Sequence, residues 1–409
     1  DECPMGGYEV TESCRGCLAH RCEDVCPRDA ITFDEHQRAH IDKEKCVNCG
    51  RCAKACPYSA IINKRRPCEI ACKVDAISTS AESKAAQIDN SKCISCGACV
   101  YMCPWGAIVD KSFITDVLKM LKESENNQKY KVYAVVAPSI SGQFSYAKLG
   151  QVITAIKKLG FHSVVEVALG ADMVAYSEAA ELAEKGFLTS SCCPAFVDYV
   201  EKCYPEQAEL ISQTPSPMVM TGRWLKEKDP GCKVVFIGPC VAKKKEFQMG
   251  KTMGAVDCVL TFEELRGMFE AKNIDFSQIP DEQAQYEASA PGVGFAASGG
   301  VAKAVEKVIE KLEPDRQVKT VYAEGLRECR QMLRMARTGK YDGYLLEGMA
   351  CPGGCIAGAG TVQPPEKSRR LLEQYKAQAP KSNPVESDYT EYLQIIREDE
   401  ENWDPVARH

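Results

Sequence analysis

The chain has 409 residues, a net charge of −6 at pH 7 and an apolar fraction of 45%. This length predicts two or three domains, and an acidic balance without a basic tail argues against a nucleic-acid partner. The sequence contains no apolar stretch of membrane-spanning length and no signal-peptide pattern, so we expect no membrane association.

Cysteine is the unusual residue in this composition. The chain contains 24 cysteines, and fourteen of them lie between Cys14 and Cys103, mostly separated by two or three residues. Neighbours that close are poorly placed to pair with each other and well placed to surround one metal cluster. A disulfide scaffold is therefore disfavoured, and a reducing, cytoplasmic compartment is expected.

Two segments in this region share one cysteine spacing. They are Cys46-x2-Cys49-x2-Cys52-x3-Cys56-Pro57 and Cys93-x2-Cys96-x2-Cys99-x3-Cys103-Pro104. The spacing is that of bacterial ferredoxins, in which three cysteines surround one [4Fe–4S] cube and the fourth reaches a neighbouring cube. Zinc is the alternative metal, but zinc sites seldom use four cysteines in this unbroken order before a proline. We therefore predict an α+β ferredoxin-like domain that binds [4Fe–4S] clusters.

Two looser copies of the motif accompany the complete ones. They are Cys14-x2-Cys17-x4-Cys22-x3-Cys26-Pro27 and the half-copy Cys68-x3-Cys72. Every copy leads into an Ala-Ile pair, at residues 30–31, 60–61, 76–77 and 107–108. This internal repeat indicates duplication of a ferredoxin half.

Counting the motifs predicts about three cubes, because three front triads of cysteines are complete and four later cysteines can each close a cluster. The triads are Cys14, Cys17 and Cys22, then Cys46, Cys49 and Cys52, then Cys93, Cys96 and Cys99; the closing cysteines are Cys26, Cys56, Cys72 and Cys103. Sequential and nested pairings both give three cubes, and both leave Cys68 and one closing cysteine over. His20 inside the first motif is expected to be a bystander, and Cys3 has no assigned role.

The remainder of the chain predicts an α/β domain with largely parallel sheets, because apolar runs alternate with helical patterns. A helix and then a polar stretch are predicted over 111–129, and this stretch marks an expected domain boundary. The predicted strands are 131–137, 163–169, 232–237, 254–260, 318–323 and 342–346. The predicted helices are 147–159, 172–185, 262–271 and 300–312.

We expect three segments along the chain. A ferredoxin-like domain is predicted over 1–112, the α/β domain over 130–363 and a C-terminal helical tail over 364–409. The tail is polar and acidic with one helical stretch near 388–398, so we expect it to be a surface appendage.

Three short cysteine motifs are spread over the α/β domain. They are Thr189-Ser190-Ser191-Cys192-Cys193-Pro194, Gly238-Pro239-Cys240-Val241-Ala242-Lys243-Lys244-Lys245-Glu246 and Glu347-Gly348-Met349-Ala350-Cys351-Pro352-Gly353-Gly354-Cys355. Each follows an apolar run that predicts a buried strand, and ligands collect beyond the carboxyl ends of parallel strands. The motifs therefore predict one buried site whose thiolates hold a cubane, with ligands Cys193, Cys240, Cys351 and Cys355. The isolated cysteines are expected to be inert buried thiols; they are Cys203, Cys232, Cys258 and Cys329.

The three motifs resemble the signatures of the [FeFe]-hydrogenases over residues 131–362. The resemblance implies two sheet-containing lobes around an H-cluster, a cubane joined to a diiron unit that carries CO, cyanide and azadithiolate. It implies the four motif cysteines as cubane ligands, with Cys355 as the bridge to the diiron unit. The implied reaction is 2 H⁺ + 2 e⁻ ⇌ H2, with a ferredoxin or similar redox protein as partner. Dedicated maturation proteins are implied to install the diiron unit.

The resemblance also implies roles for residues around the diiron unit. Cys192 is implied as the proton-transfer thiol, with a route to solvent through Glu178, Glu181 and Ser212. A solvated helix face is the alternative for either glutamate, and apolar packing alone would explain Phe295. The implied diiron contacts are Lys243 at one cyanide, Pro138 and Ser139 at the other, Met349 against the irons and Phe295 closing the pocket.

Four residues at three places depart from the family pattern, and none is a predicted cluster ligand. Ala195-Phe196 stands where many members have Gly-Trp, Gly238 replaces a methionine, and Met218 stands where glutamine is common. These departures suggest a divergent subgroup.

Three alternatives to a catalytic hydrogenase remain. A hydrogen-sensing relative is disfavoured by the presence of Cys192. A non-catalytic iron–sulfur assembly or carrier protein is disfavoured by Cys192, Lys243, Met349 and the complete third motif. A bare electron carrier would leave the C-terminal part of the chain unexplained.

Overall fold

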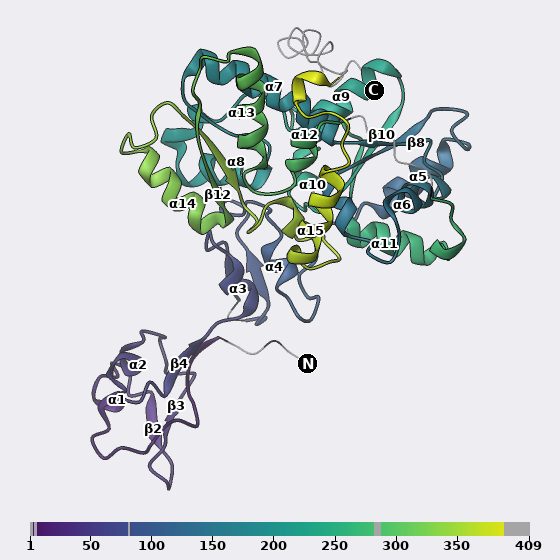
Figure 1. The fold of residues 1–409 in the computed structure, drawn as a ribbon. Helices are drawn as coiled ribbons and strands as arrows, with labels where there is room; N and C mark the ends of the chain where they lie inside the picture. The colour runs from purple at the N-terminus through teal and green to yellow at the C-terminus, as the bar shows by residue number, and fades with distance from the viewer. Residues whose placement is uncertain (1–2, 4–5, 81, 282–287, 388–409) are drawn as a thin grey trace. The chain divides into compact units, whose positions relative to one another are not determined.

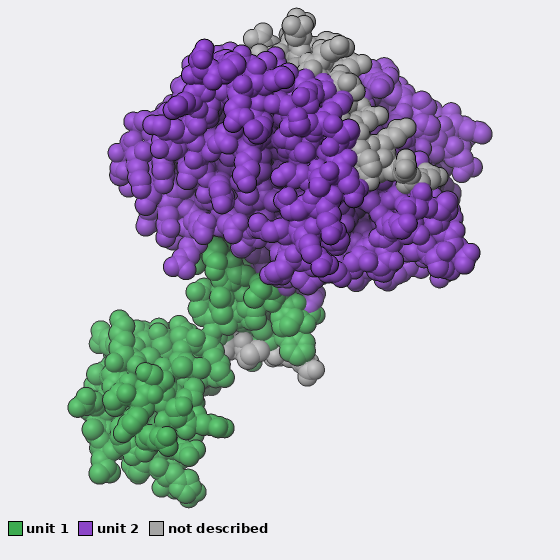
Figure 2. All heavy atoms as spheres, viewed as in Figure 1, with its two compact units in different colours: residues 1–91, 102–105 green, residues 92–101, 106–409 purple. Residues whose placement is uncertain are grey.

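The computed structural model describes residues 3, 6–80, 82–281 and 288–387 of the chain. The chain divides into two compact units, which Figure 2 colours separately. The N-terminal unit comprises Asp1–Ser91 and Met102–Trp105, and the C-terminal unit comprises Lys92–Tyr101 and Gly106–His409. Within the described ranges, no helix is long and apolar enough to cross a membrane.

The N-terminal unit is built from short antiparallel strand pairs and short helices. Strand β1 pairs with β4, β2 with β3, and β5 with β6. The strands are β1 (Gly7–Val10), β2 (Ile31–Phe33), β3 (Ala39–Ile41), β4 (Ile61–Lys64), β5 (Ile77–Thr79) and β6 (Ala86–Ile88). The helices are α1 (Arg21–Asp24), α2 (Arg51–Ala55) and α3 (Pro67–Ala71). A small core packs Cys22 and Cys52 against Ile31 and Ile61.

The repeated Ala-Ile pair has a local structural reason. The residue before each alanine (Asp29, Ser59 or Asp75) adopts a positive φ of 48–50°. This turn lets the alanine N–H donate to the sulfur of the preceding closing cysteine, at 3.2–3.4 Å, in the pairs Ala30–Cys26, Ala60–Cys56 and Ala76–Cys72. Hydrogen bonds to a ligand sulfur stabilise its thiolate form. The sequence repeat is therefore a repeat of cluster-loop geometry.

The C-terminal unit contains two sheets in which every strand pair is parallel, so the predicted α/β class is confirmed. The larger sheet has the order β11-β10-β7-β8 and the smaller the order β12-β13-β9. The strands are β7 (Val132–Val136), β8 (Ser163–Glu166), β9 (Leu188–Thr189), β10 (Lys233–Gly238), β11 (Cys258–Thr261), β12 (Lys319–Glu324) and β13 (Tyr344–Met349).

Helices cover both sheets (Figure 1). Helices α5, α6 and α11 lie beside the larger sheet, and α8, α13 and α14 lie beside the smaller one. Helix α7 packs on both α9 and α13 and so connects the two sheet regions. The helices are α4 (Ala98–Tyr101), α5 (Ile114–Glu123), α6 (Leu149–Lys158), α7 (Ala168–Lys185), α8 (Pro194–Cys203), α9 (Pro217–Lys228), α10 (Lys243–Glu246), α11 (Phe262–Ala271), α12 (Ala290–Gly294), α13 (Gly300–Leu312), α14 (Gly325–Ala336) and α15 (Pro365–Lys376).

Most predicted elements form where expected, and two strands are shorter than predicted. The run 163–169 stops being a strand at Glu166, because α7 already begins at Ala168 instead of at 172. Gly170 permits the close contact of α7 with α9, since a Cβ there would lie 2.3 Å from Pro217 O. The run 254–260 becomes β11 only at Cys258, because a turn with Gly254 at a φ of +82° precedes it.

The start of the C-terminal tail is not a surface appendage, so that expectation is wrong. Helix α15 buries Ser368, Leu372 and Tyr375, and Gln143 Nε2 donates to Ser368 Oγ at 3.1 Å. The segment has a polar composition because only one stripe of this helix is buried, and that composition led to the wrong expectation. The helical stretch predicted near 388–398 lies outside the described residues.

The predicted domain limits of 1–112, 130–363 and 364–409 stay predictions. The segment between the first two limits packs with the C-terminal unit, because Phe113 and Val117 are buried in its core.

Candidate functional site

The carboxyl ends of three parallel strands bring the motif cysteines together. Strand β9 leads to Cys193 at the N-terminus of α8, β10 leads to Cys240, and β13 leads to Cys351. Cys355 begins the short 3₁₀ helix η4 (Cys355–Ala357). Burial raises the pKa of all four thiols, to about 11 for Cys240. The charges of the neighbouring motif cysteines raise the pKa of Cys240, Cys351 and Cys355 further. Thiolates gathered this closely repel one another unless a bound cation compensates them.

Two glycines shape the loop between Cys351 and Cys355. Gly353 and Gly354 have φ values of +90° and +88°, a region that disfavours residues with a Cβ. A Cβ at Gly354 would also lie 2.6 Å from Ser298 N. The glycines therefore allow both cysteines of this loop to belong to one site.

A cavity of about 80 Å³ adjoins these cysteines. Cys193, Cys240 and Cys355 line it, together with Cys192. The residues predicted to contact a diiron unit line the same cavity; they are Pro138, Ser139, Lys243, Phe295 and Met349. The structure thus brings together residues that lie more than 200 positions apart in the sequence.

The cavity holds one cation and one hydroxyl available to a ligand. Lys243 is 8% exposed, forms an ion pair of 2.6 Å with Glu246 and donates to Cys192 O at 3.3 Å. Burial lowers the pKa of Lys243, but Glu246 outweighs it, so the net shift is upward and the side chain stays charged. Ser139 Oγ is buried and has no hydrogen-bond partner among the described residues. An anionic or hydrogen-bond-accepting ligand would satisfy both groups.

Cys192 and Glu178 are buried ionisable groups beside this cavity. Burial raises the pKa of Cys192 well above its ordinary value, and the charge of Glu178 raises it further. Burial also raises the pKa of Glu178 to about 8. Glu178 is fully buried, which excludes the solvated helix face. Its Oε1 accepts from Ser191 N at 3.2 Å, while its Oε2 is buried without a partner among the described residues.

Glu181 and Ser212 form a second pair nearer the surface. Ser212 Oγ donates to Glu181 Oε2 at 2.6 Å, and the half-exposed Lys185 contacts Glu181 Oε1 at 2.7 Å. Burial pushes the pKa of Glu181 upward, but hydrogen bonds from Lys185 and Ser212 outweigh it, so the pKa is lowered. Glu181 is therefore an ionised carboxylate, in contrast to Glu178.

A larger cavity of about 830 Å³ runs along this pair. Ser191, Ser212 and Thr214 line it on the side of the buried glutamates, and Glu246 lines it on the side of Lys243. Ser191 Oγ donates to Thr214 O at 2.5 Å and lies 3.5 Å from Glu178 Oε1. Ser191 thus connects the buried Glu178 to the larger cavity.

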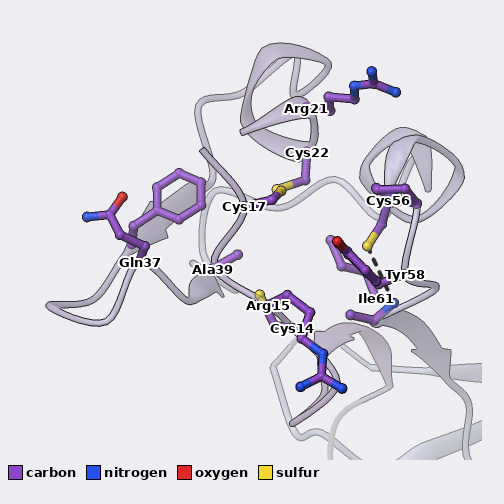
Figure 3. A pocket seen from close by; sticks show the side chains of 13 residues that line it. Cys14, Arg15, Cys17, Arg21, Cys22, Gln37, Ala39, Cys56, Tyr58 and Ile61 are labelled. Atoms are coloured by element: carbon purple, nitrogen blue, oxygen red, sulfur yellow. Dashed lines mark hydrogen bonds between the residues drawn. The ribbon is translucent and has the colours of Figure 1, made fainter. Parts of the chain in front are cut away.

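The N-terminal unit contains two small cysteine-lined cavities, and their composition favours nested pairing. Cys14, Cys17 and Cys22 line the first cavity together with Cys56 (Figure 3). The second cavity is lined by Cys26 with the middle triad of Cys46, Cys49 and Cys52. Each triad therefore meets the closing cysteine of the other motif. His20 does not line the first cavity and stacks on Phe33, with ring centroids 3.7 Å apart.

Sequence comparisons agree with this arrangement. The profile described as "Iron only hydrogenase large subunit, C-terminal domain" matches residues 130–359, and two 4Fe-4S dicluster profiles match residues 13–60 and 38–104. The periplasmic [Fe] hydrogenase large subunit of Nitratidesulfovibrio vulgaris is 30% identical over 385 residues, which covers 80% of this chain and 87% of that protein. The chain belongs to the iron-only hydrogenase family.

Other proteins are also similar to this chain. A probable cytosolic Fe-S cluster assembly factor of Aedes aegypti is 25% identical over 358 residues, which covers 68% of this chain and 75% of that protein. An [FeFe]-hydrogenase variant from Chlamydomonas reinhardtii shares the fold, with a TM-score of 0.58 and 20% identity over 72% of this chain and 95% of that one. The predicted fold class, ferredoxin-like followed by [FeFe]-hydrogenase, is confirmed.

The third triad of this hydrogenase-family chain lies in the C-terminal unit. Lys202 Nζ donates to Cys93 O at 2.6 Å. A Cβ at Gly97 would lie 2.6 Å from Ala359 Cβ and 3.0 Å from Val241. The charge of Cys96 contributes to the raised pKa of Cys351. The triad therefore packs directly against the loops that carry Cys240 and Cys355.

Two residues within the hydrogenase motifs make contacts that the sequence did not predict. Ser191 joins Glu178 to the larger cavity. Glu347 is fully buried, burial raises its pKa to about 7, and it accepts hydrogen bonds from Gly299 N at 2.8 Å and Ala302 N at 2.9 Å at the start of α13. Both lie inside quoted motifs, and their position two and four residues before a predicted ligand cysteine was the available signal.

The departures from the family pattern lie around the same cavity. Met218 is 1% exposed and lines it, which places a thioether where an amide would donate hydrogen bonds. Phe196 packs beneath Gly348, since a Cβ there would lie 2.3 Å from its ring. A Cβ at Gly238 would lie 2.5 Å from the ring of Phe236, another cavity residue.

Proposed function

We propose that this chain is a hydrogenase that catalyses 2 H⁺ + 2 e⁻ ⇌ H2 at an H-cluster. Cys193, Cys240, Cys351 and Cys355 would hold the cubane, and Cys355 would join it to the diiron unit. One observation carries this proposal: the cavity beside the four thiols is also lined by Cys192, Lys243 and Ser139. A proton-carrying thiol, a cation and an unpaired hydroxyl are the groups that chemistry at this site requires.

The residues present fit a diiron unit with cyanide and CO ligands. The Lys243 ammonium suits one anionic cyanide, and Ser139 Oγ can donate a hydrogen bond to the other. The rest of the lining is largely apolar, including Phe295 and Met349, which suits CO. When bound, the diiron unit supplies the metal at which H2 is cleaved or formed.

The proton path in this proposal begins at Cys192. Its raised pKa keeps the proton on Sγ, which makes the thiol a proton donor towards the cavity. Glu178 is also protonated at neutral pH, and it follows in the path because its Oε1 accepts from the N–H of Ser191, the residue next to Cys192, at 3.2 Å. From Glu178 the proton reaches either the Ser212–Glu181 pair or the larger cavity through Ser191.

Electrons reach the site through the cysteine-bound clusters of the N-terminal motifs. We propose three accessory [4Fe–4S] cubes, with either Cys72 or Cys103 closing the third, and a ferredoxin or similar redox protein as the electron partner. The contact of the Cys93–Cys99 triad with the loops of Cys240 and Cys355 supports the third cube as the last relay. Reduced ferredoxins of known potential, titrated against H2 output, would identify the partner class.

Infrared spectroscopy of the protein matured with its diiron unit tests the function. CO and CN stretching bands, together with H2 production from a reduced dye, are expected. Bands without turnover would contradict catalysis. The absence of bands after maturation, with intact iron–sulfur clusters, would contradict the H-cluster itself.

An iron–sulfur assembly or carrier role is the second candidate. It is favoured by the similarity to the probable assembly factor over 68% of this chain. Transfer of a labelled cluster from this chain to an apo-acceptor, without CO and CN bands, is the result that favours it over catalysis.

Cellular location and maturation complete the proposal. We propose a cytoplasmic protein, because its many cluster-ligand thiols require reducing conditions during assembly. The N. vulgaris relative is periplasmic, so cell fractionation is the direct test. We also propose a ferredoxin-like domain over 1–112, a catalytic domain over 130–363 and a tail over 364–409, with maturation proteins as transient partners.

A further inference from the structure

Cys68 is a cysteine without a role in the three-cube scheme, yet it lies in an intact cluster loop. Helix α3 follows the same plan as α1 and α2: the cysteine on the helix is 7% exposed, against 8% for Cys22 and 9% for Cys52. The closing cysteine four residues later, Cys72, accepts the same N–H to sulfur bond as Cys26 and Cys56. The half-copy therefore retains the conformation of a cluster ligand.

Cysteines four residues apart in this repeat serve different sites. Cys22 lines the first cavity and Cys26 the second, while Cys52 lines the second and Cys56 the first. By the same geometry, Cys68 does not share a cluster with Cys72. Cys68 needs ligands from elsewhere in the chain. The two positions that hold the first two cysteines of a triad are here Ile62 and Arg65.

The N-terminal segment brings Cys3 to Cys68. Strand β1 runs antiparallel to β4 with Gly7 opposite Lys64, and Gly6 lies beside the residues that follow, since a Cβ there would be 3.0 Å from Lys64 O and 3.8 Å from Arg65 Cα. The buried Arg66 fixes this arrangement, because its Nη2 donates to Cys3 O at 3.1 Å. The two thiols are close enough for their charges to interact. Cys3 is partly exposed, so the pair is accessible to iron and sulfide.

The repeat predicts a third ligand in the same unit, Cys103. Met102–Trp105 belongs to the N-terminal unit, although the triad before it belongs to the other. Cys103 occupies the repeat position of Cys56, the residue that closes the cavity of Cys22. By the same repeat, Cys103 is expected to close the site of Cys68, as Cys56 closes the cavity of Cys22.

We propose that Cys3, Cys68 and Cys103 bind a further iron–sulfur cluster held by three thiolates. Three protein thiolates suit a [3Fe–4S] cluster, or a [4Fe–4S] cluster whose fourth iron takes a ligand from solvent. The site is independent of hydrogen chemistry.

The test uses the full chain, made without the diiron unit and reconstituted anaerobically with iron and sulfide. Three accessory cubes and the catalytic cubane account for about sixteen irons per chain, so the further cluster raises the count to about nineteen or twenty. Cys68→Ser and Cys3→Ser should each lose three or four irons. An EPR signal of an oxidised three-iron cluster, present in the parent and absent from both variants, identifies the three-iron form. A parent without this signal, together with a loss of four irons in the variants, identifies the four-iron form.

Matched controls keep the outcome decisive. Cys203→Ser changes an exposed cysteine outside all the motifs and should leave iron and EPR spectra unchanged. Cys3→Ser guards against misfolding of the variant at the buried Cys68. Unchanged iron in both variants, zinc as the bound metal, or a Cys3–Cys68 disulfide in mass spectra of the parent would each overturn the proposal.

Discussion

The cysteines of the N-terminal unit and those of the C-terminal unit come together in different ways. In the N-terminal unit each triad spans nine residues or fewer, and the two triads exchange closing cysteines within a small core. In the C-terminal unit Cys193 and Cys355 lie 162 positions apart and meet only because parallel strands end at a common site. The first arrangement depends on local turns, and the second depends on the whole fold.

The two units also treat their carboxyl groups differently. In the N-terminal unit, the backbone N–H of Arg38 and the His40 side chain lower the pKa of Asp34, and Lys64 lowers that of Glu9. In the C-terminal unit, burial raises the pKa of Asp172 and Glu347 to about 7 and that of Glu178 to about 8. These three carboxyls hold a proton close to neutral pH, whereas Asp34 and Glu9 are ionised there.

The largest expected effect comes from removing the proton-holding thiol. Cys192→Ala should lower turnover about a thousandfold, which is within the range for a positioned acid–base group. The CO and CN infrared bands should remain, because Cys192 is not a cubane ligand in the proposal. H2 production and infrared spectra measured on one sample check this, and full activity in the variant would falsify the assigned role. Cys258→Ala, at a buried thiol outside the site, is the control.

Glu178 and Glu181 should differ in importance. Glu178→Gln should lower turnover about a hundredfold, because it removes the buried acid that follows Cys192. Glu181→Gln should lower it less, since Ser191 offers another way into the larger cavity. Wild-type H2 production should fall as pH rises through about 8, where Glu178 loses its proton, and this fall should be missing in Glu178→Gln. Equal losses in both variants would contradict the cavity route.

The nested pairing of the N-terminal triads can be broken at a single residue. Cys56→Ala should destroy the cluster of Cys14, Cys17 and Cys22 and spare that of Cys46, as followed by iron content and EPR. Turnover with a ferredoxin should fall several-fold, while turnover with a small reduced dye should change little. Loss of the Cys46 cluster instead would establish sequential pairing.

The sequence predicted the local features of both units well, and long-range features only through recognised motifs. Spacing alone identified the triads and the positions of Cys193, Cys240 and Cys351 after strands. It left the pairing of Cys56 and Cys26 open, because closing cysteines are equivalent in sequence and distinguished only by packing.

Other site features depend on contacts that no spacing encodes. Ser191 reaches Glu178 because α7 and the loop after β9 are neighbours in space, and the depth of Glu178 depends on the packing of α7 against α9 and α13. Helix α15 was expected on the surface because its composition is polar, although its buried stripe holds Ser368 against Gln143. Cavities and burial of this kind follow from the assembled fold.

The smallest expected effect concerns stability and compares one buried carboxyl with a partly exposed one. Burial raises the pKa of Asp172 from 3.8 to about 7, although Ser289 N and Oγ donate to it. Between these values the folded chain holds a proton that the unfolded chain has released, so stability falls as pH rises, by up to about 1.4 kcal/mol per pH unit. Asp172→Asn removes this dependence, because Asn keeps an acceptor for Ser289 N and cannot ionise. Thermal unfolding midpoints between about pH 5 and pH 7 should therefore drop less in Asp172→Asn than in the parent.

Asp34→Asn is the control and should leave the parent's drop unchanged, since the lowered pKa of Asp34 puts its proton release below this window. An identical drop in Asp172→Asn and the parent would show that Asp172 is ionised in the folded protein.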